Sequence, residues 1–284
     1  MENAPRVLRV DSRFRTSGTS TNFSYQLPES VEFPLGTTAH VSAVTLPYSW
    51  WNVDFEVNDT LYVIEDPGNA PQPRAIKLAA GQYTSLTLPT LIQNALNNGT
   101  ALGTMSYTVT YQSAQGCLLI QLVAPSGGTT NPLARFRLPS EDELMSPSWR
   151  ASFWNNNVGL NVRDPMSIGD LLRLPSVSAP TTSLSTGLLD VGPQHALYLR
   201  SNIGNYNTVG PRGERDIIAR IPVDVSYGYV LHYRHSGYEQ DSFDVGGLSL
   251  RDISFRLTNS KGAVIDLHGG QMSVEIIFVS ERTI

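Results

Sequence analysis

Cysteine, lysine and charge of either sign are scarce in this chain of 284 residues. Cys117 is the only cysteine, which excludes a disulfide within the chain. Charged residues make up 16% of the sequence, against the roughly 25% typical of soluble domains. Lys77 and Lys261 are the only lysines. Because interfaces are rich in arginine and poor in lysine, this bias indicates either interface chemistry or a general compositional preference.

The balance of charge and hydrophobicity excludes two further classes. A net charge of -5 argues against a chain built entirely for nucleic-acid binding, because such domains tend to be basic. No run approaches the ~18 apolar residues of a membrane span, so no transmembrane segment is expected. The opening residues Met1–Pro5 hold no apolar stretch, and we expect no signal peptide there.

Familiar catalytic and cofactor motifs are missing from the sequence, including phosphate-binding glycine loops, nucleophile elbows and paired Cys-x-x-Cys. His232 and His235, with Glu239 and Asp241 nearby, come closest to a metal motif. Residues three apart on a strand point to opposite faces, which favours surface or contact histidines over a metal site. Cys117 lies among apolar residues and fits an inert, buried thiol. We therefore expect no enzyme, no cofactor and no metal.

Alternation with a period of two dominates both ends of the chain. Phe23, Tyr25 and Leu27 share one parity, and Pro28 is expected to end that strand. Many short strands with turn residues between them predict a β-sandwich or barrel. The other predicted strands cover residues 40–46, 60–64, 197–200, 216–221, 229–233, 253–257, 263–267 and 272–279.

The middle of the chain has a different character. Residues 86–98 place apolar side chains on one helical face, with Thr87 as a possible cap and Gly99 as a stop. Residues 107–123 predict a β-hairpin, and Ser140 followed by three acidic residues predicts a second helix start. We expect a mainly β protein in which residues 1–65 and 191–284 form a sandwich with an N-terminal arm. Residues 66–190 then form an α+β insertion with one clear helix; two tandem domains are the alternative.

Four arginines stand close together in the N-terminal segment: Arg6, Arg9, Arg13 and Arg15. On an extended arm they would neutralise phosphates of a genome or pair with carboxylates of a neighbouring subunit. A solvated basic tail is the third interpretation.

Two adjacent aromatic residues, Trp50 and Trp51, follow a predicted strand. Packing in a core or an interface is favoured for them, and stacking on a sugar is the alternative. Neighbouring strand residues point to opposite faces, so at most one of the two rings would be exposed.

Several blocks of the sequence resemble the penton proteins of virophages and polinton-like DNA viruses. The opening block from Leu8 to Leu27 contains Asp-Ser-Arg followed by a Ser-Gly-Thr stretch and a first strand. The block from Val41 to Asn52 resembles the strand that follows, and Gly81–Thr84 with the predicted helix resembles the insertion of that family. The block from Leu248 to Ile277 resembles its closing strands.

The resemblance implies a jelly-roll β-sandwich and a structural role in a virion. It implies a homopentamer at the five-fold vertices of an icosahedral DNA virus, in contact with the major capsid protein. At 284 residues the chain is too short for the two jelly rolls of that major capsid protein. Two other classes stay open: a carbohydrate- or receptor-binding module, and a glycosidase, which would need two carboxylates about 5–10 Å apart.

Overall fold

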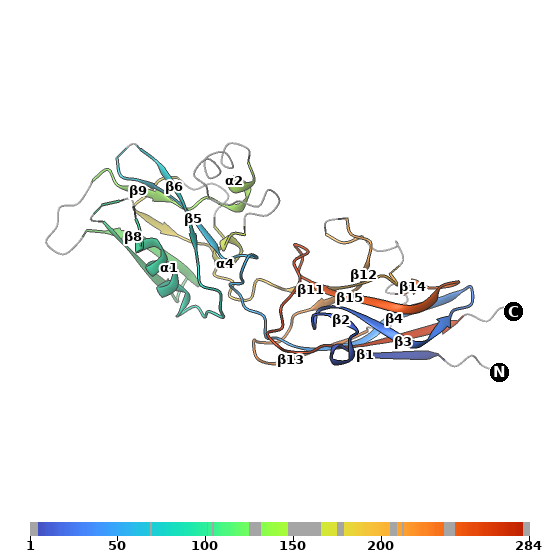
Figure 1. The fold of residues 1–284 in the computed structure, drawn as a ribbon. Coiled ribbons are helices and arrows are strands. Elements are labelled where there is room, and N and C mark those ends of the chain that lie inside the picture. The colour runs from blue at the N-terminus through green and yellow to red at the C-terminus, as the bar shows by residue number, and fades with distance from the viewer. Residues whose placement is uncertain are drawn as a thin grey trace. The chain divides into compact units, whose positions relative to one another are not determined.

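The computed structural model describes residues 5–68, 70–100, 102–103, 105–124, 132–146, 166–174, 179–204, 209–211, 213–235 and 242–280. The chain is mainly β and divides into two compact units (Figure 1). Unit 1 comprises Met1–Trp50 and Gln194–Ile284, and unit 2 comprises Trp51–Pro193. Within the described residues, no helix is long and apolar enough to cross a membrane.

Unit 1 is a β-sandwich of two antiparallel sheets. The first sheet has the order β1-β16-β4-β13, and β14 pairs with β4. Its strands are β1 (Arg6–Asp11), β16 (Ser273–Ser280), β4 (Thr37–Pro47), β13 (Val230–Arg234) and β14 (Phe243–Asp244). The second sheet has the order β12-β11-β15-β3-β2. Its strands are β12 (Ile217–Pro222), β11 (Ala196–Ser201), β15 (Ser249–Thr258), β3 (Asn22–Glu32) and β2 (Ser17–Gly18).

The strand order is that of a jelly roll. Along the chain, β1, β3, β4 and β11 alternate between the two sheets, and after β12 the strands β13, β15 and β16 alternate again. This connectivity joins two Greek keys into one sandwich, as in eight-stranded jelly rolls. The predicted mainly β fold, a jelly-roll sandwich with an inserted segment, is therefore confirmed. The insertion interrupts the connection between β4 and β11.

The core of the sandwich follows the predicted alternation. Ile253, Phe255 and Leu257 of β15 are at most 1% exposed, and the Phe255 ring centroid lies 5.5 Å from that of Phe23 on β3. On β16, alternate residues from Val274 to Phe278 are buried in the same way. Full burial of one large aliphatic or aromatic side chain stabilises the fold by about 1.5–3 kcal/mol.

Pro28 does not end the first long strand, because β3 continues to Glu32. The partner β2 covers β3 only opposite Phe23 and Ser24, so Pro28 lies on an open edge where no ladder hydrogen bond is needed. The register with β15 is also interrupted there, between Leu250 and Asp252. The strand predicted for residues 263–267 is reduced to one bridge, between Val264 and Thr258.

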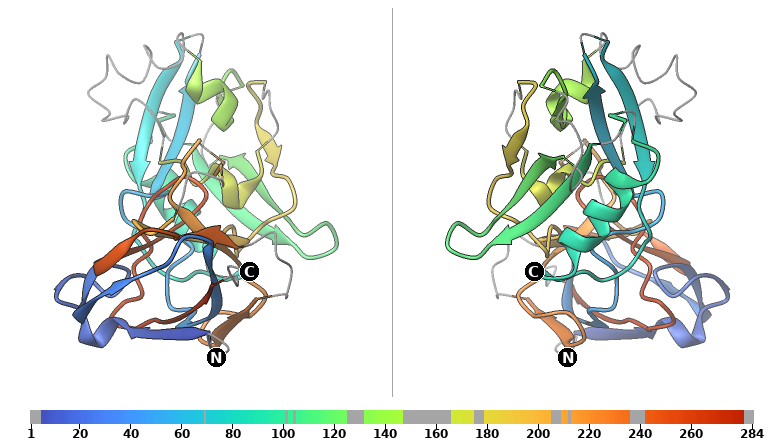
Figure 2. Two further views of the ribbon diagram at one scale, coloured as in Figure 1. Left: turned by 90° about the vertical axis from the view of Figure 1, so that its right-hand side faces the viewer. Right: turned by 90° about the vertical axis from the view of Figure 1, so that its left-hand side faces the viewer.

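Unit 2 contains two small sheets, with the orders β6-β5-β9 and β10-β8-β7. Figure 2 shows the helix α1 (Leu88–Asn97) against the hairpin of β7 and β8. Leu88, Ile92 and Leu96 of this helix are fully buried, which confirms the predicted apolar face. The strands are β5 (Thr60–Asp66), β6 (Gln72–Lys77), β7 (Ser106–Gln112), β8 (Cys117–Val123), β9 (Arg135–Arg137) and β10 (Ser183–Ser185).

The predicted helix caps have different outcomes. Thr87 precedes α1 but makes no side-chain cap bond, because its hydroxyl accepts a hydrogen bond from the Thr84 amide instead, at 2.9 Å. Ser140 does cap the short helix α2 (Glu141–Met145), and its hydroxyl accepts from the Glu143 amide at 3.2 Å. The Glu143 carboxylate accepts in return from the Ser140 amide at 3.0 Å, completing a capping box. Among the described residues, α4 covers Gly169–Leu172.

The boundaries of the inserted unit differ from the expected residues 66 and 190. Strand β5 was assigned to the sandwich from sequence, yet it pairs with β6 and β9 and joins the core of unit 2. The division therefore falls between Trp50 and Trp51 on one side and between Pro193 and Gln194 on the other. Alternation alone does not reveal which sheet a strand joins, because pairing partners lie far away in the sequence.

Candidate functional site

The segment expected to be a basic arm is, from Arg6 onward, the first strand of the sandwich. Strand β1 pairs with β16 from Arg6 opposite Phe278 to Asp11 opposite Ser273. The Arg9 Nε lies 2.7 Å from the Glu275 Oε2 across this pair. The Arg9 guanidinium holds the pKa of the Glu275 carboxyl below its usual range, mainly through this hydrogen bond.

Arg13 and Arg15 fold back on a tight turn after β1. Asp11 caps this 3-10 turn, accepting the Arg13 amide at 2.9 Å and its guanidinium at 2.5 Å. These contacts keep the pKa of the Asp11 carboxyl below its usual range. Arg15 donates to the carbonyls of Ser12 at 2.7 Å and Gly18 at 3.0 Å. Three of the four N-terminal arginines thus have partners in their own chain, and a genome or subunit contact through them stays a prediction.

The two tryptophans lie in different surroundings. Trp50 is 2% exposed, and its ring stacks on Tyr48 with centroids 4.1 Å apart, so a sugar has no access to its faces. Trp51 is half-buried. Exposed tyrosines lie on the connection from β12 to β13, where Tyr227 is 41% and Tyr229 is 67% exposed.

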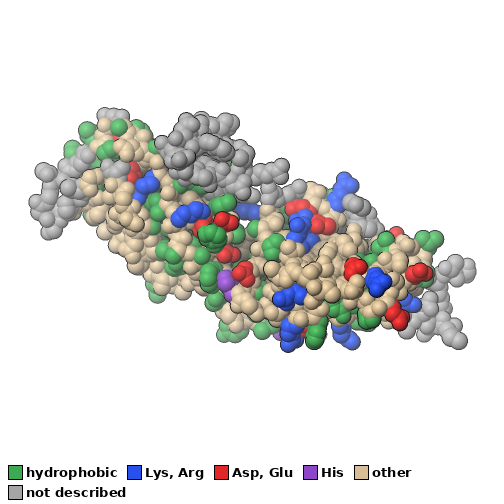
Figure 3. All heavy atoms as spheres, in the orientation of Figure 1, with side chains coloured by type: hydrophobic (Ala, Val, Ile, Leu, Met, Phe, Trp, Pro, Cys, Tyr) green, Lys and Arg blue, Asp and Glu red, His purple; other side chains and the backbone are tan. Residues whose placement is uncertain are grey.

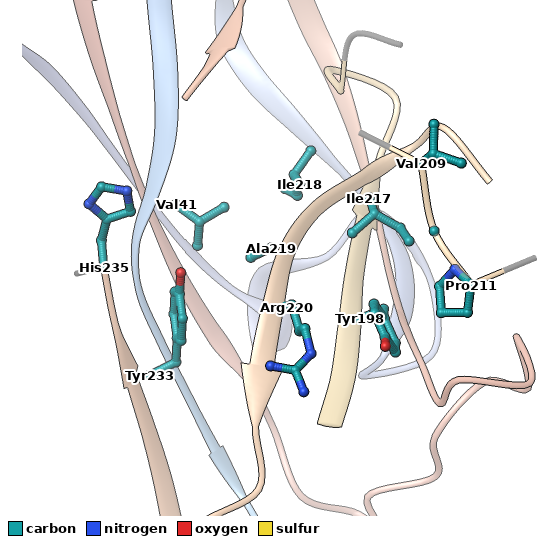
Figure 4. A pocket seen from close by; sticks show the side chains of 11 residues that line it. Val41, Tyr198, Val209, Pro211, Ile217, Ile218, Ala219, Arg220, Tyr233 and His235 are labelled. Atoms are coloured by element: carbon teal, nitrogen blue, oxygen red, sulfur yellow. The ribbon is translucent and has the colours of Figure 1, made fainter. Parts of the chain in front are cut away.

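A cavity of about 410 Å³ runs beside β12, the edge strand of the second sheet, and we call it the β12 groove. Its floor is apolar, and Tyr198, Arg220, Tyr233 and His235 contribute its polar groups. Figure 4 shows Tyr233 and His235 on one side of β12 and Tyr198 and Pro211 on the other. The lining residues are Val41, Tyr198, Val209, Gly210, Pro211, Ile217, Ile218, Ala219, Arg220, Tyr233 and His235.

Arg220 is the charged residue of the β12 groove. It stands directly opposite Tyr198 in the ladder, so the two side chains leave the sheet on the same face. Arg220 is exposed, and within the described residues it has no ion-pair partner. A groove with an apolar floor and one uncompensated guanidinium is suited to an apolar group that carries a negative charge beside it.

His232 and His235, the histidines of the candidate metal motif, have different partners in the structure. The His232 Nδ1 lies 3.2 Å from the Thr45 hydroxyl, whereas the His235 ring packs against His40 with centroids 4.5 Å apart. The pKa of His40 lies below its usual value, mainly because the ring is partly buried and also because of the neighbouring His235. Glu239 and Asp241 lie outside the described residues. Within the part of the chain that the structure describes, no group of three or more His, Cys, Asp or Glu could hold a metal ion.

Two further charged clusters have their groups engaged with one another. In unit 1, Arg200 and Arg256 share Asp216, at 2.7 Å and 3.3 Å, within a polar depression on the second sheet. In unit 2, the fully buried Glu65 carboxylate accepts from Arg74 at 2.7 Å and from the Tyr107 hydroxyl at 2.9 Å. Such mutual pairing is typical of structural ion pairs.

The surface carries charges of both signs. On the face drawn in Figure 3, basic and acidic side chains of the described residues are interspersed and form no broad basic patch. Residues that sequence reasoning missed are Arg220 and the exposed Phe55, which is 67% accessible. In the sequence, Phe55 stands between the acidic residues Asp54 and Glu56, which is a signal for an exposed position. The exposure of its ring, however, depends on the tertiary structure.

Comparison with known proteins gives a likeness of fold and no likeness of sequence. No protein-family model and no curated protein matches this sequence. The fold is similar to the crystal structure of the selenomethionine-labelled mavirus penton protein, with a TM-score of 0.53. The alignment covers 98% of this chain and 100% of that chain at 8% sequence identity. The resemblance inferred from the sequence is confirmed at the level of the fold, over both units.

Proposed function

We propose that this chain is a structural capsid protein, the penton subunit that occupies the five-fold vertices of an icosahedral DNA virus. The observation that carries the proposal is the fold likeness to the mavirus penton protein over 98% of this chain and all of that one. Fold alone does not establish function. The proposal therefore also draws on the sequence blocks and on the surface chemistry.

The Asp-Ser-Arg block that carries the resemblance has a structural role in the sandwich. Asp11 caps the turn after β1, and Ser12, fully buried, donates to the Gln271 side chain at 2.8 Å. Gly18, in the following Ser-Gly-Thr stretch, has φ of +92°, and a Cβ there would lie 2.1 Å from the Asn22 carbonyl oxygen. Glycine is required at this turn. The block therefore contributes residues that the sandwich needs in order to fold.

The surface chemistry suits assembly with other protein subunits. Tyr227 and Tyr229, before β13, and Val230, its first residue, expose apolar and aromatic surface, and aromatic residues are enriched in interfaces. A ring of identical subunits needs heterologous contacts, in which two different patches of each copy meet. We propose that five copies form such a ring and that the ring contacts the major capsid protein in the virion. The N-terminal arginines, Arg6 above all, are candidates for further contacts with neighbours or genome.

We propose no catalytic role for the chain. The buried carboxylates of unit 2 are held by arginine, tyrosine and lysine partners, as for Glu65 with Arg74 and for Asp59 with Lys77 at 2.6 Å. These pairs link neighbouring strands, a role that requires no substrate.

The test is the mass of the purified full-length chain by native mass spectrometry and light scattering. A penton subunit should form a species of five times 31.1 kDa, and the assembled particles should contain it. A chain that stays monomeric at high concentration and is absent from virions contradicts the proposal.

A carbohydrate- or receptor-binding module is the alternative. The burial of Trp50 speaks against stacking of a sugar on that residue. A glycan-array signal that disappears in Trp51→Ala, in a protein that remains folded, would favour the alternative.

A further inference from the structure

A phenylalanine projects from a hydrogen-bonded turn at the start of unit 2. Phe55 is 67% exposed, between Asp54 and the exposed Glu56. Monomeric proteins expose single apolar residues routinely, so exposure alone means little. The distinguishing feature here is the hydrogen-bonded turn that carries the exposed ring.

Five hydrogen bonds fix this turn, one of them from the Phe55 amide to the Asp54 Oδ1 at 2.9 Å. The Asn58 Oδ1 accepts from the Asp54 amide at 2.8 Å, and the Asp54 carbonyl accepts from the amides of Val57 and Asn58, both at 3.2 Å. The Glu56 amide donates to the buried Asp59 at 3.2 Å. Glu56 itself adopts φ of +57°, a left-handed conformation that is strained for a residue with a side chain. A turn fixed in this way loses little conformational entropy when its tip is bound.

The β12 groove offers a complementary surface in unit 1. A cavity of roughly 150 Å³ accommodates benzene, and the β12 groove has about 410 Å³. It therefore has space for a phenyl ring and the backbone beside it. Ile217, Ala219 and Val41 supply an apolar floor, and Arg220 supplies a positive charge.

Charge distinguishes Phe55 from two other exposed apolar residues, Phe14 and Leu86. Within the described residues, neither Glu56 nor Arg220 has an ion-pair partner, and their charges are opposite. Phe14, 73% exposed, lies between Arg13 and Arg15, and like charges would meet if it approached Arg220. Leu86, 75% exposed, has Ser and Thr as neighbours and offers no counter-charge.

We propose that the Phe55 turn of one copy of this chain docks into the β12 groove of a second copy, with Glu56 pairing with Arg220. The two patches differ, so the contact is heterologous, as a closed ring requires. The inference rests on the proposed function, because it names a contact through which the subunits of the ring would meet. Desolvated aromatic anchors and paired arginines dominate the binding energy of such interfaces.

Substitution of the two partners tests the contact in the full-length chain. Phe55→Ala, Glu56→Arg and Arg220→Glu should each raise the concentration of half-assembly by about tenfold or more, measured by mass photometry. The double variant Glu56→Arg with Arg220→Glu should recover most of the loss, because the charges again pair. Leu86→Ala is the matched control and should stay within about twofold of the wild type. All of these side chains are exposed, so unfolding should not produce the effect.

Photo-cross-linking locates the contact directly. The photoreactive residue p-benzoylphenylalanine replaces Phe55 or, as a control, Leu86, and cross-linked peptides between copies are identified by mass spectrometry. Cross-links from position 55 to residues 209–220 support the docking. A ring that survives Phe55→Ala and Arg220→Glu, or that cross-links elsewhere, overturns the docking and leaves the proposed function standing. A chain that never associates contradicts both, and Phe55-dependent dimers without rings support the docking alone.

Discussion

Ser12 and Met272 exchange two hydrogen bonds that tie the end of the first strand to the start of the last. The Ser12 amide donates to the Met272 carbonyl at 2.9 Å, and the Met272 amide donates to the Ser12 hydroxyl at 3.0 Å. Both residues are at most 1% exposed. The opening block and the closing strands are separate parts of the sequence resemblance. In the structure these two hydrogen bonds join them directly.

Ser12→Ala should destabilise the sandwich, because the buried Met272 amide loses its acceptor. We expect the free energy of unfolding to fall by about 1–3 kcal/mol in urea titrations. Ser17→Ala, at an exposed position, serves as the control and should change it by less than about 0.5 kcal/mol. Equal effects of the two substitutions would show that the tie contributes nothing specific.

The buried Glu65 cluster should be the most sensitive point of unit 2. Glu65→Ala removes the counter-charge of Arg74 and the acceptor of the Tyr107 hydroxyl, and should cost about 3–5 kcal/mol. Tyr107→Phe removes one donor and should cost about 1–3 kcal/mol. Burial and the Glu65 charge raise the pKa of Tyr107, so its hydroxyl stays protonated and this cost should not depend on pH across the neutral range.

Tyr111→Phe, on the same strand and half-buried, is the matched control for Tyr107→Phe. Thermal unfolding followed by tryptophan fluorescence and by circular dichroism reports both losses. A Glu65→Ala chain as stable as the wild type would contradict the interpretation of this cluster as a structural ion pair.

The pair of His40 and His235 should make stability depend on pH. Burial and the His235 charge lower the pKa of His40 from 6.5 in the folded chain. Between the folded pKa and 6.5 the unfolded chain binds more protons, so the free energy of unfolding falls as the pH drops through that window. Below the folded pKa this loss is complete, and above about pH 7 it is absent.

Urea titrations from about pH 8 to about pH 5 measure this dependence. His40→Gln should flatten the decline, because the titrating group is gone. An identical slope in His40→Gln and in the wild type would contradict the assignment.

The sequence predicted the elements whose signal is local. The parity of Ile253, Phe255 and Leu257 and the helical face of Leu88, Ile92 and Leu96 needed no knowledge of distant partners. The assignment of β5 to the sandwich was wrong, because its pairing with β6 and β9 is decided by segments elsewhere in the chain.

The candidate contact residues were harder to predict, because exposure and pairing arise only after folding. Arg9, Arg13 and Arg15 looked like a free basic cluster, yet each one binds an oxygen of its own chain. For Trp50 the sequence favours packing in a core or an interface over a sugar-binding platform, and the ring lies within the core. Arg220 was not predicted as a contact residue, because nothing in the neighbouring sequence shows that β12 is an edge strand beside an apolar groove.

Trp50 separates the structural interpretation from the carbohydrate-binding alternative. Trp50→Ala should lower the free energy of unfolding by about 3–5 kcal/mol, because it removes a buried ring stacked on Tyr48. Trp51→Ala, at a half-buried position, should cost less, and both are measured in urea. A Trp50→Ala chain that keeps its stability and loses a glycan-array signal would support the alternative instead.

Electron cryo-microscopy of purified particles of the virus that encodes this chain tests the central claim most directly. The proposal predicts five copies of the jelly-roll sandwich around each five-fold axis, in contact with the major capsid protein. Vertices built from another protein, or particles that lack this chain, would contradict it.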